Sequence, residues 1–268
     1  MSGRLTVCPT PIGNLSDITV RVIEALRSAD VIACEDTRRT ATLCAAHSIS
    51  TRLMSLHEHN EQARAPELVE RIAAGGKVAL VSDAGMPLVS DPGARLVAAV
   101  LDAGLELDVL PGASAVTTAI AVSGLSGGGF VFAGFLPRSA AARETALRRF
   151  DTAGLPVVVF ESPRRLPATL RALSEREPER RAAVCRELTK LHQEVARGTL
   201  SELAEQFRSA PRGEITLVLQ AVDAPAAQVP LDALSELAGT IGVRRAAELG
   251  ARLTGAPRNQ LYRALTGR

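Results

Sequence analysis

The chain has 268 residues, of which 46% are hydrophobic and 22% charged, and its formal net charge is +2. This composition is that of a globular protein long enough for two packed domains, and it excludes a chain that is disordered as a whole. The small positive charge neither requires nor excludes a nucleic-acid partner, whereas an aromatic content of 3% disfavours a base-stacking sheet of the RNA-recognition-motif kind.

The first predicted unit is a strand, a stiff loop and a helix. A short apolar run ends at Pro9 and Pro11, and apolar residues at helical spacing follow over residues 16–28. Ser16 or Asp17 is expected to cap this helix. Because ligands bind at the carboxyl ends of the strands in an open parallel sheet, we expect a small-molecule site at this loop.

Strands and helices continue to alternate, which predicts a first α/β domain over residues 1–124 with a mostly parallel sheet. Asp91 and Pro92 are expected to be the cap and the first residue of one helix. The further predicted strands cover residues 31–34, 52–55, 77–82 and 107–110, and the helices cover 38–47, 61–74, 92–103 and 114–123.

A second α/β domain, with a mixed or antiparallel sheet, is predicted over residues 125–222. The glycine-rich run at its start, residues 124–129, precedes a strand instead of following one, so it is no dinucleotide-binding fingerprint. The predicted strands cover residues 130–133, 156–160, 182–186 and 215–220; the helices cover 140–150, a segment after Pro163, and 200–207.

The last predicted unit, residues 223–268, is a linker with a basic helical tail. Residues 221–230 are rich in alanine and proline, and three helical patterns follow over 231–239, 243–254 and 260–266. The tail carries six arginines, at positions 244, 245, 252, 258, 263 and 268, against three acids, Asp232, Glu236 and Glu248. Such a tail is either an RNA-docking element or a solvated helical face.

No apolar stretch approaches the length of a membrane span, about 20 residues, and the first residues lack the apolar core of a signal peptide. We therefore expect a cytoplasmic protein without membrane contact. The four cysteines, Cys8, Cys34, Cys44 and Cys185, form no C-x-x-C pair and lie mostly in or beside apolar segments. Reduced core thiols are expected in place of disulfides or a metal site.

Six motifs, taken together, resemble one family. They are Cys8–Asn14, Glu35–Arg38, Val81–Gly93, Leu110–Ala115, Phe160–Leu166 and Cys185–Lys190. In order and spacing they are similar to the ribosomal RNA small subunit methyltransferase I family, which makes a 2′-O-methylcytidine in 16S rRNA. The resemblance implies two α/β domains of the tetrapyrrole-methylase type with a cofactor cleft between them, a small C-terminal helical appendage, and a homodimer.

The resemblance also implies S-adenosylmethionine as the cofactor. Its contacts are expected from Pro11, Gly13, Asp83, Gly85, Met86, Ser114, Ala115 and Leu188. Met86 stands where threonine is usual, and Ala113 and Arg164 also depart from the family pattern, which puts the fine shape of the pocket in question. The residues agree with this cofactor, since Asp83 can accept a hydrogen bond and the helix start at Ser114 offers donors. Alternatively, Asp83 and Asp91 only cap turns and helices.

A ribose hydroxyl is a weak nucleophile, so a nearby base or cation would help methyl transfer. The candidates are Lys190, Glu35, Asp36, Arg38 and Glu187. Lys190 is one of two lysines in an arginine-rich chain, and the pKa of a lysine falls on burial. For Glu35–Arg38, a strand end followed by a capped helix is an equally good reading. His57 and His59 lack a third ligand, so no metal site is expected.

Two alternatives to rRNA methylation stay open. One is a small-molecule methyltransferase of the same fold that acts on a tetrapyrrole-like substrate, and the other is a non-catalytic RNA-binding assembly protein. The basic tail and the Glu35–Arg38 motif favour the rRNA methyltransferase. The expected partner is then 16S rRNA, either free or within the small ribosomal subunit.

Overall fold

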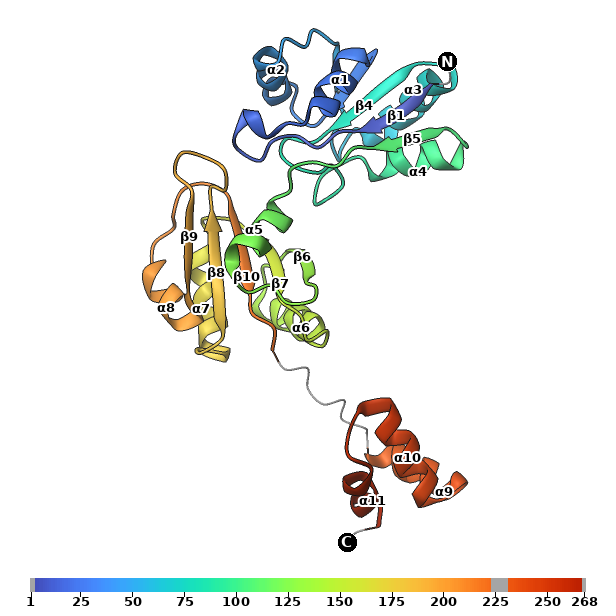
Figure 1. Cartoon of the computed structure of the whole chain (residues 1–268), viewed down its shortest axis with the longest axis vertical. Helices are drawn as coiled ribbons and strands as arrows, with labels where there is room; N and C mark the ends of the chain where they lie inside the picture. The colour runs from blue at the N-terminus through green and yellow to red at the C-terminus, as the bar shows by residue number, and fades with distance from the viewer. Residues whose placement is uncertain (1–2, 223–230, 267–268) are drawn as a thin grey trace.

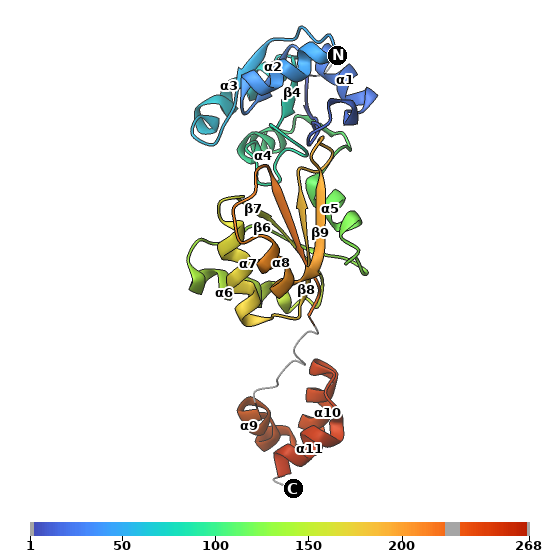
Figure 2. The same ribbon diagram turned by 90° about the vertical axis from the view of Figure 1, so that its left-hand side faces the viewer.

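The computed structural model describes residues 3–222 and 231–266. Two five-stranded sheets are followed by a group of three helices (Figures 1 and 2). In both views the first sheet lies at one end, the second in the middle and the three C-terminal helices at the other end. No helix among the described residues has the length and apolar character that a membrane crossing requires.

The first sheet is parallel throughout and has the strand order β3-β2-β4-β1-β5. All four residues of β2 and four of the five in β4 are buried, as expected for central strands covered on both faces. The strands are β1 (Arg4–Val7), β2 (Val31–Cys34), β3 (Leu53–Ser55), β4 (Lys77–Val81) and β5 (Glu106–Val109). The helices of this part are α1 (Val20–Ser28), α2 (Thr37–Ala46), α3 (Glu61–Ala73) and α4 (Ala94–Asp102).

Two predicted helix caps in the first part are wrong. The helix expected from Ser16 begins only at Val20, because the Thr19 side chain accepts a hydrogen bond from the Val22 amide. Ser16 and Asp17 lie instead in a short 3-10 turn. The helix expected after Asp91 begins at Ala94, following Gly93, so Asp91 is two residues too early to cap it.

The second sheet is mixed, with the order β6-β7-β10-β8-β9. Only β6 and β7 are parallel to each other, and the remaining neighbours are antiparallel. The strands are β6 (Val131–Phe135), β7 (Val157–Glu161), β8 (Arg181–Arg186), β9 (Glu194–Thr199) and β10 (Ile215–Leu219). The edge strand β9 was not predicted, because its sequence is polar except at Val195 and Ala196.

Helices cover both faces of the second sheet. On one face α6 (Ala140–Asp151), α7 (Leu166–Arg176) and α8 (Leu200–Gln206) contribute to a core with Leu147, Leu170 and Leu203. On the other face, α5 (Ala115–Ser123) packs against β10, β8 and β7. Since α5 directly follows the last strand of the first sheet, the chain crosses between the two sheets at residues 110–114.

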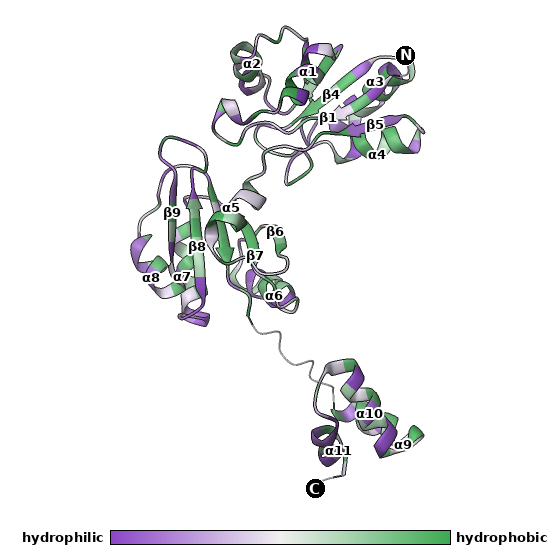
Figure 3. Cartoon of the chain, in the orientation of Figure 1, coloured by the Kyte–Doolittle hydropathy of each residue, from purple (hydrophilic) through white to green (hydrophobic). Residues whose placement is uncertain are grey.

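Hydropathy follows this layering. Figure 3 shows hydrophobic colour along central strands such as β8 and hydrophilic colour on the outer faces of helices such as α8. All four cysteines are buried and free, as predicted. Burial raises the pKa of the Cys8 thiol to about 12 and that of Cys185 to about 11, so both stay protonated at neutral pH.

The C-terminal helices are α9 (Leu231–Ile241), α10 (Val243–Thr254) and α11 (Arg258–Thr266), and they pack on one another. Their small core contains Leu234, Ala247 and Leu261. The expected helix over 243–254 is confirmed at both ends, while α9 extends past its predicted end at 239 to Ile241. Residues 223–230 of the expected linker lie outside the described residues.

Candidate active site

The loops after β1 and β4 are tied together at the carboxyl end of the first sheet. The amide of Thr10 donates to the carbonyl of Gly85 at 2.8 Å, and the amide of Gly85 donates to the carbonyl of Thr10 at 2.9 Å. The Thr10 hydroxyl also donates to the carbonyl of Ser82. This pairing holds the two loops as one wall at the edge where ligands bind in parallel sheets.

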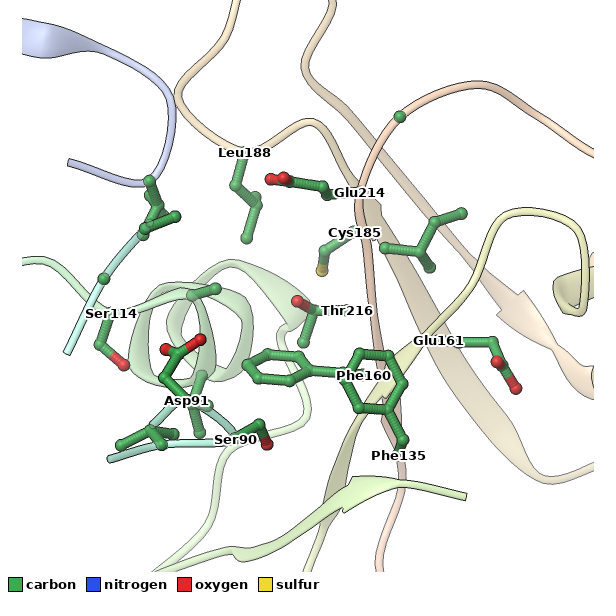
Figure 4. A pocket seen from close by; sticks show the side chains of 18 of the residues that line it. Ser90, Asp91, Ser114, Phe135, Phe160, Glu161, Cys185, Leu188, Glu214 and Thr216 are labelled. Carbon is green, nitrogen blue, oxygen red and sulfur yellow. The ribbon is translucent and has the colours of Figure 1, made fainter. Parts of the chain in front are cut away.

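A cavity of about 400 Å³ lies where this wall faces the second sheet (Figure 4). This volume is within the usual range for a small-molecule site, about 300–1,000 Å³. Five of the eight predicted cofactor residues line it: Gly85, Met86, Ser114, Ala115 and Leu188. The first four come from the first sheet's loops and the start of α5, whereas Leu188 follows β8 of the second sheet.

The other three predicted cofactor residues line an adjoining cavity. Pro11, Gly13 and Asp83 surround a space of about 290 Å³. Ile12 and Ala84 line both cavities, so the two spaces are neighbours. The structure therefore brings the predicted cofactor residues to one region but divides them between two compartments.

The start of α5 offers hydrogen-bond donors to the larger cavity. Ser114 is the N-cap of α5, yet its side chain makes no capping hydrogen bond to the helix. The hydroxyl and the first amides of a nine-residue helix are thus available to a ligand's acceptors, and the helix dipole favours negative charge there. The carboxyl of Asp91 adds an acceptor, and Ile12, Met86 and Leu188 form an apolar wall. This combination fits S-adenosylmethionine, because its carboxylate needs donors, its ammonium an acceptor and its adenine an apolar surface.

Three carboxyl groups, those of Glu35, Asp83 and Asp91, lie near one another at the carboxyl ends of β2 and β4. Asp83 accepts a hydrogen bond of 3.0 Å from the Asp36 amide and lies 3.4 Å from the Arg39 guanidinium. Burial, together with the charges of Glu35 and Asp83, raises the pKa of Asp91 to about 7. Burial and Asp83 likewise raise the pKa of Glu35. Of these three groups, only Asp91 lines the larger cavity.

The Glu35–Arg38 segment lies outside both cavities. Asp36 caps α2 through the Arg38 amide at 2.9 Å, and the Arg38 guanidinium binds the same carboxylate. These hydrogen bonds lower the pKa of Asp36 to about 2, which makes it a weak proton acceptor. The segment therefore matches the capped-helix alternative, and catalytic roles for Glu35, Asp36 and Arg38 stay predictions.

Lys190 is held in an ion pair instead of being free in the cleft. Its ammonium donates to Glu187 at 2.8 Å and to Glu214 at 2.9 Å. Burial lowers the pKa of Lys190, but the hydrogen bonds to the two carboxylates outweigh this and raise it overall. The net direction is therefore opposite to the one that burial alone would give. Lys190 still lines the smaller cavity, while Glu187 lines neither of the two.

The loop that carries Lys190 touches the first sheet's loop. The Asn14 amide donates to the Thr189 hydroxyl at 3.1 Å. At Gly13 a Cβ atom would lie 2.4 Å from Cγ of Lys190, so only glycine allows this close approach. Gly13 thus lets two loops from different sheets meet beside the cavities.

Several lining residues were not predicted. Asp91 was assigned to a helix cap, and its place in the S-D-P part of a quoted motif was the signal that could have identified it. Phe135 carried no signal, because its orientation depends on an irregular strand. The second sheet contributes further lining residues that were missed: Phe160, Glu161, Ser162, Glu214 and Thr216.

The histidine pair gains no metal partner in the described part of the chain. The rings of His57 and His59 lie 6.0 Å apart. No group of three or more His, Cys, Asp or Glu side chains placed to hold a metal ion occurs within residues 3–222 and 231–266.

Comparison with known proteins points to one family. The model of the tetrapyrrole (corrin/porphyrin) methylases matches residues 4–204, and that of the RsmI C-terminal HTH domain matches 223–268. Two curated proteins named ribosomal RNA small subunit methyltransferase I are similar to this chain. The one from Mesorhizobium japonicum is 43% identical, over 97% of this chain and 90% of its own; the one from Thermotoga maritima is 47% identical, over 81% and 98%.

A solved structure shares the fold. Uroporphyrin-III C-methyltransferase from Thermus thermophilus, in complex with S-adenosylhomocysteine, superposes with a TM-score of 0.59 at 18% identity. The match covers 81% of this chain and 97% of that one. At this identity the likeness concerns the fold alone, and it confirms the predicted two-domain α/β architecture.

Proposed function

Because the chain belongs to the tetrapyrrole methylases, and among them to the ribosomal RNA small subunit methyltransferase I family, we propose that it methylates 16S rRNA. The methyl donor is S-adenosylmethionine, and the acceptor is the 2′-oxygen of a cytidine ribose. One observation of the structure supports this most: a cavity between the two sheets is lined by five of the residues expected to bind the cofactor.

The cofactor supplies a sulfonium methyl group that already has a strong leaving group. The chain's own residues therefore have to align the acceptor oxygen and exclude water. Ser114 and the first amides of α5 offer donors, Asp83 and Asp91 offer acceptors, and Met86 and Leu188 form an apolar wall.

Asp91 is the group best placed to take the proton of the ribose hydroxyl. It lines the larger cavity, and its pKa of about 7 suits a general base at neutral pH. Glu35 and Asp83 surround it with negative charge, which raises its proton affinity, while the nearby Ser82 hydroxyl acts in the opposite direction. None of the predicted candidates Glu35, Asp36, Arg38 or Glu187 lines this cavity.

The C-terminal helices are the part that binds RNA in this proposal. They carry Arg244, Arg245, Arg252, Arg258 and Arg263 within the described residues, and the matching family model is a helix-turn-helix domain. The curated relatives that match this chain at 43–47% identity are named for rRNA, whereas the uroporphyrin methyltransferase shares only the fold. This favours rRNA over a tetrapyrrole-like substrate and over a non-catalytic assembly role.

Two further parts of the proposal are the oligomeric state, given first, and the cellular location. The family resemblance implies a homodimer, and a substrate in the small ribosomal subunit places the protein in the cytoplasm, where these subunits are assembled. Sedimentation equilibrium of the purified chain checks the first, with twice the chain mass of 28.1 kDa expected. A mass of one chain at all concentrations would contradict the dimer.

Transfer of a labelled methyl group tests the function. The purified chain is incubated with S-adenosylmethionine labelled in the methyl group and with small subunits from a strain that lacks this modification. Parallel reactions contain free 16S rRNA or a tetrapyrrole precursor. We expect label in rRNA from at least one RNA substrate and none in the tetrapyrrole; label in the tetrapyrrole alone would support the alternative.

A further inference from the structure

β6 is irregular where it reaches the cavity. Its pairing with β7 shifts register between Phe132 and Phe135, and Gly134, at the shift, has φ 63. Glycine adopts this left-handed conformation without strain, and a β-bulge of this kind re-aims the side chain beside it. Gly134 also lies close to the first sheet's loop, since a Cβ there would be 3.7 Å from Oγ of Ser90.

The bulge gathers three phenylalanine rings. In a regular strand, Phe132 and Phe135 would point to opposite faces, because side chains alternate with a period of two. Here both rings contact Phe160, with centroids 5.0 Å from Phe132 and 5.7 Å from Phe135. Phe135 and Phe160 both line the larger cavity, and Figure 4 shows their rings together, with Ser114 and Asp91 to one side and Glu161 to the other.

Phe135 is one of only six phenylalanines in the chain, and it is open to solvent. Its relative exposure is 56%, whereas Phe207 is buried and Phe150 packs against the core. A single exposed apolar residue needs no explanation. Phe135 differs because a bulge directs it, another ring supports it, and it lies at the mouth of the cavity.

We propose that Phe135, supported by Phe160, is the surface on which a nucleobase of the RNA substrate stacks while its ribose enters the cavity. This rests on the function proposed above. A nucleotide that reaches an enclosed site loses stacking with its neighbours, and an aromatic ring replaces that contact. Because every base has a flat face, Phe135 positions the nucleotide without identifying it.

The exposure of Phe135 favours the RNA over the cofactor as its partner. The predicted cofactor residues Ser114 and Leu188 lie on other walls of the cavity, as Figure 4 shows. More than half of the Phe135 surface can be approached from outside, which suits a group that arrives with a macromolecule.

The test compares Phe135→Leu, which keeps an apolar side chain but removes the ring, with Phe135→Tyr, which keeps the ring. Methylation of unmodified small subunits is measured together with S-adenosylmethionine affinity by calorimetry. We expect Phe135→Leu to lower kcat/KM by about 5- to 150-fold, the range of one base–aromatic stack, with unchanged cofactor affinity. Phe135→Tyr should stay close to wild type.

Phe130→Leu is the matched control, because Phe130 is 37% exposed just before β6 but does not line the cavity. It should leave kcat/KM unchanged. Wild-type kcat/KM in Phe135→Leu would overturn the stacking role, and a loss of cofactor affinity equal to the loss in kcat/KM would assign the ring to the cofactor. Wild-type protein without activity on any RNA would instead overturn the proposed function itself.

Discussion

Asp91 lies at the wall of the larger cavity, near two further carboxyl groups. Burial and the charges of Glu35 and Asp83 raise its pKa to about 7, against an ordinary value of 3.8. The folded protein therefore prefers this group protonated, and ionising it costs stability. A carboxylate with a raised pKa lowers the free energy of unfolding when it ionises, but it accepts a proton more readily near neutral pH. Such a trade-off between stability and activity is common in active sites.

Asp91→Asn should change stability in a pH-dependent way. The unfolded chain releases the Asp91 proton near pH 4 and the folded chain near pH 7, so wild type loses stability as pH rises through this window. The amide has no such loss. We expect Asp91→Asn to melt at a higher temperature than wild type at pH 8, and by a clearly smaller margin at pH 5, because the margin closes only as pH falls towards 4.

Asp102→Asn serves as the control, because Asp102 is exposed in α4. Its melting temperature should differ from that of wild type by the same amount at both pH values. A difference between Asp91→Asn and wild type that is likewise independent of pH would show that the pKa of Asp91 is not raised.

Asp83→Ala should weaken S-adenosylmethionine binding while the fold persists. A hydrogen bond to a charged group contributes about 1.5–3 kcal/mol, so we expect an affinity loss of about 10- to 150-fold by calorimetry. Asp36→Ala is the matched control: Asp36 belongs to the same hydrogen-bond network but lines neither cavity. Equal affinity in Asp83→Ala and wild type would remove Asp83 from the cofactor site.

At the scale of elements, α9–α11 are a separate helical unit with their own small core. Deleting residues 223–268 should weaken binding of small subunits far more than binding of the cofactor, because the deleted part carries a surplus of arginines. Full-length binding should weaken as salt rises, since phosphate contacts release counterions. Subunit affinity that is unchanged by the deletion would make the unit purely structural.

Most elements could be predicted from the sequence, and the exceptions have physical causes. Buried strands such as β2 and β4 are continuous apolar runs, which makes them easy to identify. The edge strand β9 lacks such a run and was missed. Helix starts were misjudged where several capping residues compete, as at Ser16, Asp17 and Thr19.

At the scale of the molecule, the site is shared between the two sheets. Ser114 and Met86 come from the first, while Leu188 and Phe160 come from the second. The family motifs predicted residues that line the two cavities, because five of the six motifs contribute to the cavity walls and only Glu35–Arg38 does not. They did not predict the division of those residues between two cavities, nor Phe135, since both depend on how distant segments meet.

The position of the transferred methyl group tests the central claim most directly. Small subunits lacking the modification are treated with the full-length chain and S-adenosylmethionine, the 16S rRNA is digested to nucleosides, and these are separated by mass spectrometry. The account predicts 2′-O-methylcytidine that is absent when the protein is omitted. A methyl group on a base, or on no nucleoside in any RNA substrate, would contradict it.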